Sequence, residues 1–236
     1  MKKPLMFAAV LLASTVQAQI TVAYNERPPY LVATRDGSPS GLTGTPAAQA
    51  FRAAGIDVRW VRMPTNRQIA MVRENSAQYC AVGWFRNDER AQFAKFTRPI
   101  YRDHRWVAMT GLFFDASEGQ PLEELMGRGG LRLMVKDKYS YGPRIDAMLS
   151  RFHPVTAVST GSTVQMLQSL SANTVDLMFV SEEEAAYLMS LGGPHAGKLR
   201  VLNLAGMPKG EERHIMCSLN VPDELIAKLN REIVFR

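Results

Sequence analysis

The segment IDVRWVRMPTNRQIAMVRENSAQYCAVGW, residues 56–84, decides the fold class. Its first part, Ile56–Val61, alternates apolar and polar side chains, as a half-buried strand does. Thr65–Glu74 has the pattern of an amphipathic helix, and its first and fourth residues, Thr and Gln, stand in the positions of a capping box. Tyr79–Trp84 is a short apolar run, which is typical of a buried strand. The order strand, helix, strand predicts an α/β fold with a mainly parallel sheet.

The same pattern extends to both sides of this segment. Upstream, Ile20–Tyr24 predicts a strand and Ala47–Ala54 a helix that ends at Gly55. Downstream, Trp106–Phe114 is extended and apolar, and a second set of elements follows it. The expected strands are Leu131–Val135, Val155–Val158, Asp176–Val180, Val201–Leu204 and His214–Leu219, and the expected helices are Pro143–Phe152, Thr163–Leu170, Glu182–Leu191 and Asp223–Phe235. We therefore expect two α/β lobes.

Composition and motifs exclude several classes of protein. The chain has 236 residues, of which 46% are apolar and 21% charged, so it is neither disordered nor a disulfide-dense miniprotein. A net charge of +6 is too small at this length to require an anionic macromolecule, and acidic and apolar residues interrupt the basic cluster 86–105, so we expect no nucleic-acid partner. His-Glu-x-x-His, Cys-x-x-Cys and Gly-x-Ser-x-Gly motifs are absent, so we expect no metal, no cofactor and no catalytic residue.

The first 18 residues have the pattern of a secretory signal peptide. Lys2 and Lys3 precede the largely apolar run Leu5–Val16, and the small-x-small sequence Val16-Gln17-Ala18 follows. As a helix, this run is too short to span a hydrocarbon core of roughly 30 Å. We therefore expect cleavage after Ala18 and a soluble protein exported to the periplasm.

Three stretches of the mature chain carry a resemblance to a known family. They are Ile20–Tyr30 with its Pro-Pro-aromatic corner, Asp36-Gly37 followed by Gly41-Leu42 and a helix that ends at Gly55, and Val82–Arg90 followed by Phe96–Tyr101. The third is the most specific, because it places a glycine, a helix start and an arginine at fixed offsets. Together they resemble the bacterial extracellular solute-binding proteins of family 3, the substrate-binding components of ABC importers for polar amino acids.

This resemblance implies a two-lobed fold of the periplasmic binding protein type II. Each lobe would be a mainly parallel sheet flanked by helices, and the lobes would close on a ligand like a hinge. Residues 19–110 would form the first part of lobe 1, residues 111–205 an inserted lobe 2, and residues 206–236 the return to lobe 1 with its closing helix. The two crossovers would lie near Ala108–Phe114 and Leu204–Lys209.

The resemblance also implies a function. The protein would capture an amino acid or a related small carboxylate and deliver it, as a monomer, to a membrane ABC permease, without catalysis. Two alternatives stay open. One is an enzyme on the same scaffold, similar to dehydratases that act on small cyclic carboxylates. The other is a periplasmic sensor component that passes its liganded state to a receptor.

Arg90 is the main candidate for ligand binding. The arginine at this place in the family's motif holds the ligand's carboxylate, and a guanidinium matches a carboxylate in a bidentate way. The alternative is a surface arginine paired with Glu89 or Asp103. Gly83 ends a predicted strand, where its backbone could approach a ligand and its carbonyl could accept a hydrogen bond from a ligand's ammonium group, unless it is a packing glycine.

Other candidates in the first lobe surround these two. Phe85 replaces a threonine that is common in the family, and together with Trp84 it would form an apolar floor or part of the core. Tyr24 and Asn25 stand where the family offers an acid at the end of the first strand. Tyr30, in the Pro-Pro corner, would stack on the ligand or pack in the core.

The remaining candidates have equally ordinary alternatives. Arg67 would add a second cation or lie solvated on its helix. Ser140 and Tyr141 would present backbone N–H groups at a helix start, either to a carboxylate or as ordinary capping. Ser181 takes the place of an ammonium-binding aspartate of the family, with Glu182 beside it. Ser181 also begins a capping-box pattern three residues before Glu184.

The two cysteines fall in strands that the resemblance places side by side. Cys80 lies in Tyr79–Trp84 and Cys217 in His214–Leu219. In the family's sheet these strands are neighbours, so the resemblance implies a Cys80–Cys217 disulfide, which an oxidising periplasm permits. Two buried free thiols are the alternative.

Overall fold

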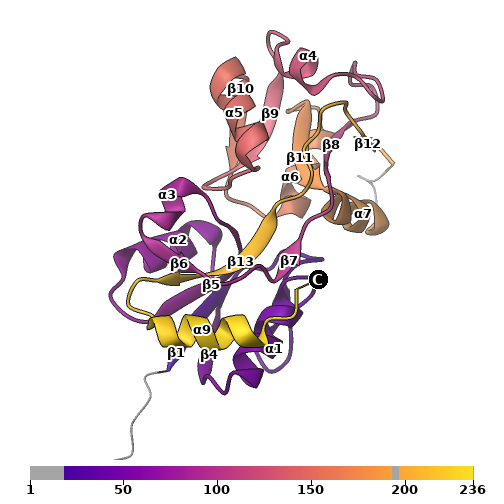
Figure 1. Cartoon of the computed structure of the whole chain (residues 1–236). Coiled ribbons are helices and arrows are strands. Elements are labelled where there is room, and N and C mark those ends of the chain that lie inside the picture. Colours follow the sequence, from indigo (N-terminus) through magenta and orange to yellow (C-terminus); the bar gives the residue numbers. More distant parts are fainter. Residues whose placement is uncertain (1–18, 193–196, 236) are drawn as a thin grey trace, which may run out of the picture.

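The computed structural model describes residues 19–192 and 197–235, and the predicted signal peptide, residues 1–18, lies outside them. Within the described ranges, none of the helices combines the length and apolar character that crossing a membrane requires. The chain forms two lobes, each built on its own β-sheet and flanked by helices (Figure 1). The predicted α/β class is confirmed.

Lobe 1 is built on a six-stranded sheet in the order β4-β1-β5-β13-β6, with β7 paired to β13. Its strands are β1 (Ile20–Tyr24), β4 (Val58–Arg62), β5 (Tyr79–Phe85), β6 (Ala94–Phe96), β7 (Tyr101–Arg102) and β13 (Glu212–Ser218). Strand β1 is parallel to β4 and β5, whereas β13 is antiparallel to β5, β6 and β7. The sheet therefore joins a parallel half from the start of the chain to an antiparallel strand from near its end.

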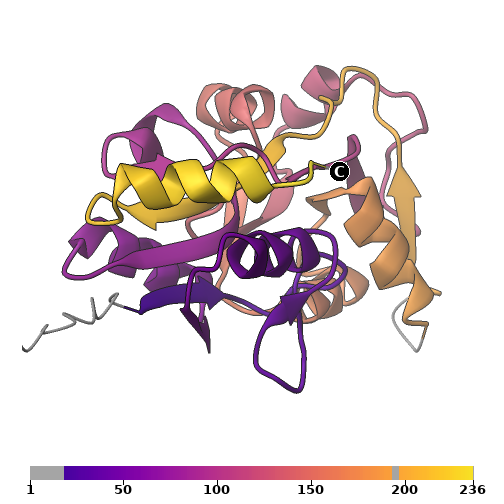
Figure 2. The same ribbon diagram turned by 60° about the horizontal axis from the view of Figure 1, so that its bottom comes forward.

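Helices cover both faces of this sheet. They are α1 (Gly44–Ala53), α2 (Thr65–Glu74), the short α3 (Asp88–Ala91) and α9 (Asp223–Glu232), and a small hairpin of β2 (Val32–Ala33) and β3 (Pro39–Ser40) precedes α1. Helices α1 and α9 contact each other on one face (Figure 2), where Phe51 and Leu229 pack with Val22 of β1. On the other face, Val72 of α2 packs with Ala23. Successive residues of β1 thus point into different halves of the core.

Lobe 2 is built on a five-stranded sheet in the order β10-β9-β11-β8-β12. Its strands are β8 (Trp106–Gly111), β9 (Arg132–Lys136), β10 (Val155–Ser159), β11 (Leu177–Ser181) and β12 (Leu199–Leu202), and its helices are α4 (Leu122–Met126), α5 (Pro143–Phe152), α6 (Thr163–Ser171) and α7 (Glu182–Ser190). Strand β9 is parallel to β10 and β11, and β8 is antiparallel to β11 and β12. Helices α4 and α5 pack on one face and α6 and α7 on the other.

Two segments cross between the lobes, residues 103–105 after β7 and residues 203–211 before β13 (Figure 1). They are hydrogen-bonded to each other: the Asp103 N–H donates to the Glu211 carbonyl (3.1 Å) and the Trp106 N–H to the Pro208 carbonyl (3.2 Å). Gly210 makes this contact possible, because a Cβ at that position would collide with the carbonyl oxygens of Asp103 and His104.

The first crossover lies earlier in the chain than we expected. Residues Ala108–Phe114 were expected to connect the lobes, but Trp106–Gly111 forms β8, which pairs on both sides within the second sheet. All six residues of β8 are buried. The long apolar run therefore reflects a central strand of lobe 2, so that the sheet of this lobe begins at Trp106. The return segment, residues 203–211, includes the expected Leu204–Lys209.

Helices α2 and α5 have the predicted bounds, but the predicted capping box of α2 is wrong. Pro64 is the N-cap residue, so Thr65 already lies inside the helix. The side chain of Gln68 is buried instead and donates to the Met63 carbonyl (2.9 Å), while the indole N–H of Trp84 donates to it (3.1 Å). A glutamine three residues into a helix can serve either purpose, and here it serves a buried network.

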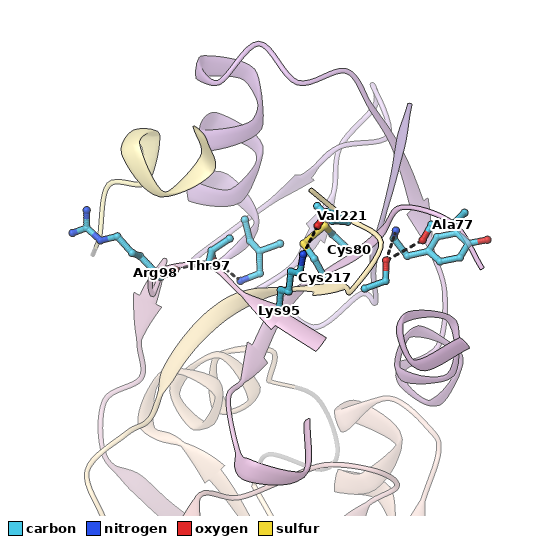
Figure 3. The surroundings of a disulfide bond; sticks show 10 residues. Ala77, Cys80, Lys95, Thr97, Arg98, Cys217 and Val221 are labelled. Carbon is cyan, nitrogen blue, oxygen red and sulfur yellow. Dashed lines mark hydrogen bonds between the residues drawn. A yellow bond between two sulfur atoms is a disulfide. The ribbon is translucent and has the colours of Figure 1, made fainter. Parts of the chain in front are cut away.

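Cys80 and Cys217 form a disulfide between β5 and β13, as the resemblance implied (Figure 3). The two residues are direct partners in the antiparallel ladder. Beside them, the Ser218 hydroxyl accepts from the Tyr79 N–H (3.0 Å) and donates to the Ala77 carbonyl (2.9 Å). The disulfide therefore joins β5, in the first part of lobe 1, to β13, the strand that returns from lobe 2.

We expect this disulfide to stabilise the protein mainly by restricting the unfolded chain. The two cysteines are 137 positions apart, which corresponds to up to roughly 4–5 kcal/mol in the chain-entropy model. The double variant Cys80→Ala, Cys217→Ala should lose a few kcal/mol of the free energy of unfolding, measured by urea denaturation of oxidised wild type and variant. Reduced wild type is the control and should resemble the variant. Equal stability of all three forms would contradict the expectation.

Candidate ligand-binding site

A cavity of about 500 Å³, including space continuous with solvent, lies between the lobes. Lobe 1 contributes residues from the ends of β1 and β5, and lobe 2 contributes Tyr139 and Ser140 from the loop after β9. These are the carboxyl ends of parallel strands, the edge at which ligands bind in α/β proteins.

Arg90 of α3 lies in the wall of this cavity and is only 5% exposed. Its guanidinium donates to the Phe85 carbonyl (2.8 Å) and, across the cleft, to the Lys138 carbonyl (3.1 Å), and it lies 4.8 Å from the ring centroid of Trp84. In the described part of the chain no carboxylate lies within 4.0 Å of it. Burial therefore lowers the pKa of the Arg90 guanidinium.

The two carboxylates considered as alternative partners of Arg90 pair with other arginines. Glu89 binds Arg73 at the surface (2.7 Å). Asp103 binds Arg213 of β13 through two hydrogen bonds of 2.6 Å. The surface-pair interpretation of Arg90 is therefore wrong, because both acids are occupied elsewhere.

Arg213 also lines the cavity, and hydrogen bonds and contacts with aromatic rings fix its guanidinium in place. Besides Asp103, its guanidinium donates to the Gly83 carbonyl (3.0 Å), and it lies 4.2 Å from the Tyr30 ring and 4.5 Å from the Phe85 ring. Burial alone would lower the pKa of Arg213, but the facing charge of Asp103 outweighs burial and raises it. The carbonyl of Gly83, which we expected to accept from a ligand, thus already has an arginine as its donor.

Gly83 has the conformation that its position requires. Its φ of +84° favours glycine, and the register of β5 against β13 skips it, since Val82 pairs with Ile215 and Trp84 with His214. A Cβ at Gly83 would lie 3.2 Å from the hydroxyl of Thr43, which also lines the cavity. The bulge therefore turns the end of β5 toward the cleft.

Arg27 is the third arginine of the cavity wall and joins the two lobes. It forms a bidentate ion pair with Glu184 of α7 (2.9 and 2.6 Å), and it lies 4.9 Å from the ring of Tyr139. The Glu184 side chain is 1% exposed and also accepts from the Thr163 hydroxyl (3.0 Å). Burial alone would raise the pKa of Glu184, but the charge of Arg27 and its hydrogen bonds outweigh burial and lower it.

Hydroxyl groups add further contacts between the lobes. The Tyr30 hydroxyl donates to Ser181 (2.5 Å), and the Tyr101 hydroxyl donates to Glu183 (2.6 Å). Ser181 caps α7 by accepting from the Glu184 N–H (3.2 Å). The expected capping box is only half present, because the Glu184 carboxylate binds Arg27 of lobe 1.

Seven of the predicted site residues line this one cavity, and five do not. Those that line it are Asn25, Tyr30, Gly83, Trp84, Phe85, Arg90 and Ser140. Those that lie outside its wall are Tyr24, Arg67, Tyr141, Ser181 and Glu182. The structure thus brings together residues from three separate stretches of sequence, 25–30, 83–90 and 140, and Arg90 is among them.

Each residue outside the cavity has a structural role or is exposed. Tyr24 is buried, and its hydroxyl donates to the Gly37 carbonyl (2.9 Å). Ser181 is buried and accepts from the Tyr30 hydroxyl in the contact between the lobes. Arg67 is exposed on α2. Tyr141 packs against Trp106 in the core of lobe 2. Glu182 is 43% exposed and pairs with Arg105 (3.2 Å).

The helix start at α5 offers fewer free donors than we expected. The Tyr141 N–H donates to the Asp146 carboxylate (2.8 Å), and the Gly142 N–H donates to the Ser140 hydroxyl (3.2 Å). The side chains of this segment therefore satisfy these two N–H groups, which is the ordinary-capping interpretation.

Sequence reasoning missed several cavity residues, above all Arg27, Trp106, Tyr139 and Arg213. Arg27 lies inside the Ile20–Tyr30 stretch, next to the Pro-Pro corner, so its position in that stretch could have indicated a place in the cavity wall. Arg213 carried no local signal, because its partner Asp103 is 110 positions away. In the described residues, no group of three His, Cys, Asp or Glu side chains is arranged to hold a metal ion.

The sequence profile of the bacterial extracellular solute-binding proteins, family 3, matches residues 20–212. The chain belongs to this family. The resemblance seen in the three sequence stretches is thereby confirmed, and the solute-binding character of the family agrees with a cavity between two lobes. No curated protein matches the chain in sequence.

Solved structures with the same two-lobed fold are distant in sequence. An ancestral arginine-binding protein bound to arginine has a TM-score of 0.69 at 16% identity, over 92% of this chain and 91% of that one. The arginine-, lysine-, histidine-binding protein ArtJ from Geobacillus stearothermophilus has a TM-score of 0.71 at 18% identity, over 92% and 88%. A histidine kinase sensor domain with similarity to periplasmic binding proteins has a TM-score of 0.70 at 16% identity, over 91% and 88%. At these identities the similarity establishes the fold.

We expect the Arg27–Glu184 pair to make stability depend on pH. Because the folded-state pKa of Glu184 is below its ordinary 4.5, the pair contributes fully above that value and is lost as the pH falls through the lowered pKa. Glu184→Gln should cost about 3–5 kcal/mol of the free energy of unfolding at pH 7, because it leaves Arg27 buried without its partner. The difference from wild type should shrink below pH 4.5, as measured by urea denaturation at several pH values.

The exposed pair of Arg62 and Glu26, with side chains 63% and 45% exposed, supplies the matched control. Glu26→Gln should change the free energy of unfolding by less than about 1 kcal/mol at any of these pH values. A loss in Glu184→Gln that is equally small at pH 7 would show that the buried pair does not hold the lobes.

Proposed function

We propose that this protein is a periplasmic solute-binding protein that captures an amino acid or a related small carboxylate between its lobes and delivers it to a membrane ABC permease. It would act as a monomer exported by a cleaved signal peptide, and it would bind its ligand without converting it. The observation that carries this proposal is the buried guanidinium of Arg90, which lies in the cavity wall, touches both lobes and has only neutral partners.

The physical argument concerns the charge of Arg90. The buried Arg90 cation has lost most of its hydration, and the attraction of Glu89 and Asp146 does not outweigh that cost. Its hydrogen-bond partners are carbonyls, so no opposite charge in the described residues is in direct contact with it. A ligand carboxylate within reach of its Nη atoms would supply that charge through a bidentate contact. Because Arg90 donates to the Lys138 carbonyl of lobe 2, a ligand held there would be bound at the boundary of the two lobes. This is the place where binding and lobe closure are coupled.

A sensor role is the second candidate, and one observation favours it. The histidine kinase sensor domain named above has the same fold over 91% of this chain. In that role the same cavity would bind the same class of ligand, and the closed lobes would be recognised by a receptor in place of a permease. Pull-down of membrane proteins on the liganded mature protein separates the two: recovery of permease subunits supports transport, and recovery of a receptor supports sensing.

We expect the loss of Arg90 to abolish ligand binding while leaving the fold intact. A thermal-shift screen of the mature protein against the twenty amino acids and a panel of small carboxylates should give at least one compound that raises the melting temperature. Arg90→Met should weaken binding of that compound by about 10²-fold or more, since removing one partner of a buried charge pair costs about 2–5 kcal/mol. Isothermal titration calorimetry measures the difference.

Arg86 provides the matched control, because it is an exposed arginine outside this cavity and four residues before Arg90. Arg86→Met removes the same charge and should leave the dissociation constant within about twofold of wild type. Mass spectrometry of the compound after incubation should find it unchanged. A compound that binds Arg90→Met as tightly as wild type, or that is turned over, would contradict the proposal.

A further inference from the structure

The wall of the cavity carries positive charges and no negative one. Arg27, Arg90 and Arg213 line it, and none of the other lining residues is an Asp or a Glu. Two of these arginines have buried carboxylate partners, Glu184 and Asp103, which stand behind them and outside the lining. The charge that faces a ligand is therefore that of Arg90, with two neutralised pairs beside it.

A second donor in the same wall has no acceptor. Trp106, at the start of β8, lines the cavity and is 2% exposed, and its indole N–H has no hydrogen-bond partner in the residues that the structure describes. Buried indole N–H groups normally have a partner. Arg90 and Trp106 thus add a cationic donor and a neutral donor to one cavity, and both types of donor suit an anion.

An α-ammonium group would find no charged partner in this wall. Such a group needs acceptors, and the acceptors that line the cavity are uncharged and partly engaged. The Asn25 side-chain oxygen accepts from Gln68 (3.3 Å), and the Gly83 carbonyl accepts from Arg213 (3.0 Å). Freeing Asp103 or Glu184 for an ammonium group would leave Arg213 or Arg27 buried without a carboxylate.

Carboxylates appear only beyond this cavity. Glu89 and Asp146 line an adjoining outer cavity that shares Arg90, Tyr139 and Ser140 with the inner one. Asp146 there accepts from the Ser140 hydroxyl and from the Tyr141 N–H, and Glu89 binds Arg73. An amino acid bound at Arg90 would have to extend its ammonium group out of the inner cavity to reach them.

We infer that the inner cavity is selective for a carboxylate anion that carries no ammonium group, such as a 2-oxo acid or an unsubstituted carboxylic acid. The inference rests on the proposed function, since it presumes a carboxylate at Arg90. Aromatic rings of Tyr30, Trp84, Phe85, Trp106 and Tyr139 line the same space, so the body of the ligand is apolar. The site thus departs from one that recognises a zwitterion by pairing both of its charges.

Matched ligand sets test this selectivity. Each set holds an amino acid, its deamino acid and its 2-oxo acid: phenylalanine with 3-phenylpropanoate and phenylpyruvate, leucine with 4-methylpentanoate and 4-methyl-2-oxopentanoate, and alanine with propanoate and pyruvate. Isothermal titration calorimetry of the mature protein at pH 7.5 should show at least tenfold tighter binding of an ammonium-free member than of its amino acid. Arg90→Met should remove that binding.

Asn25→Asp adds a second, independent measurement. The substitution is nearly isosteric, keeps an oxygen that can accept from Gln68, and places one carboxylate in the cavity wall. It should reduce the preference for the ammonium-free acid by tenfold or more. Gln168→Glu adds the same charge on the exposed surface of α6 and should leave the preference unchanged.

The outcomes separate this inference from the proposed function. An amino acid that binds more tightly than its ammonium-free partners, with binding lost in Arg90→Met, overturns the inference and leaves the proposed function standing. If Asp146→Asn weakens that amino acid selectively, the ammonium group lies in the outer cavity. If no compound in these sets or in the wider panel binds in an Arg90-dependent way, both the inference and the proposed function fail.

Discussion

The bidentate ion pair between Arg213 and Asp103 is the interaction on which the rest of the cleft depends. Asp103 lies in the segment that leaves lobe 1, and Arg213 lies in β13, just after the segment that returns. The pair therefore fastens the two crossing segments together, at a place where Gly210 lets their backbones touch. The same guanidinium lies against Tyr30 and donates to the Gly83 carbonyl, so hinge and cavity share one side chain.

The contacts of Arg213 with both the crossing segment and the cavity wall explain why the end of β5 is irregular. The bulge at Gly83, with its φ of +84°, brings a carbonyl within 3.0 Å of Arg213 and directs Trp84 and Phe85 to different surroundings. Trp84 packs on the α2 side of lobe 1, whereas Phe85 joins the core cluster of lobe 2. A regular strand would place alternate side chains on the two faces of its own sheet. The irregular end instead lets lobe 1 contribute an aromatic ring to the packing of lobe 2.

The sequence predicted those features that depend on near neighbours or on a long family motif. The bounds of α2 and α5, the α/β class and the place of Arg90 in the cavity wall belong to this group, and the disulfide followed from the strand order of the family. The Arg213–Asp103 and Arg27–Glu184 pairs could not be predicted, because their members are 110 and 157 positions apart and an arginine in a strand or loop is ordinarily exposed. Gln68 was misread because a glutamine near a helix start fits a cap as well as a buried network. The first crossover was misplaced because nothing within the apolar run Trp106–Phe114 distinguishes an extended linker from a strand. Its first six residues are all buried and form β8, which pairs on both sides within the sheet of lobe 2.

The charges of the cleft divide into two groups with different consequences. Arg213–Asp103 and Arg27–Glu184 are neutral as pairs, and replacing a buried ion pair with apolar residues of equal volume is often neutral for stability. Their contribution is therefore better sought in which arrangement of the lobes is favoured, since each pair is satisfied only when specific segments meet. Arg90 has no such internal partner in the described chain, so its charge is free to be met by something that enters the cleft. In the described residues the two neutral pairs would then favour one arrangement of the lobes, while under the proposed function the ligand would be recognised through the charge of Arg90.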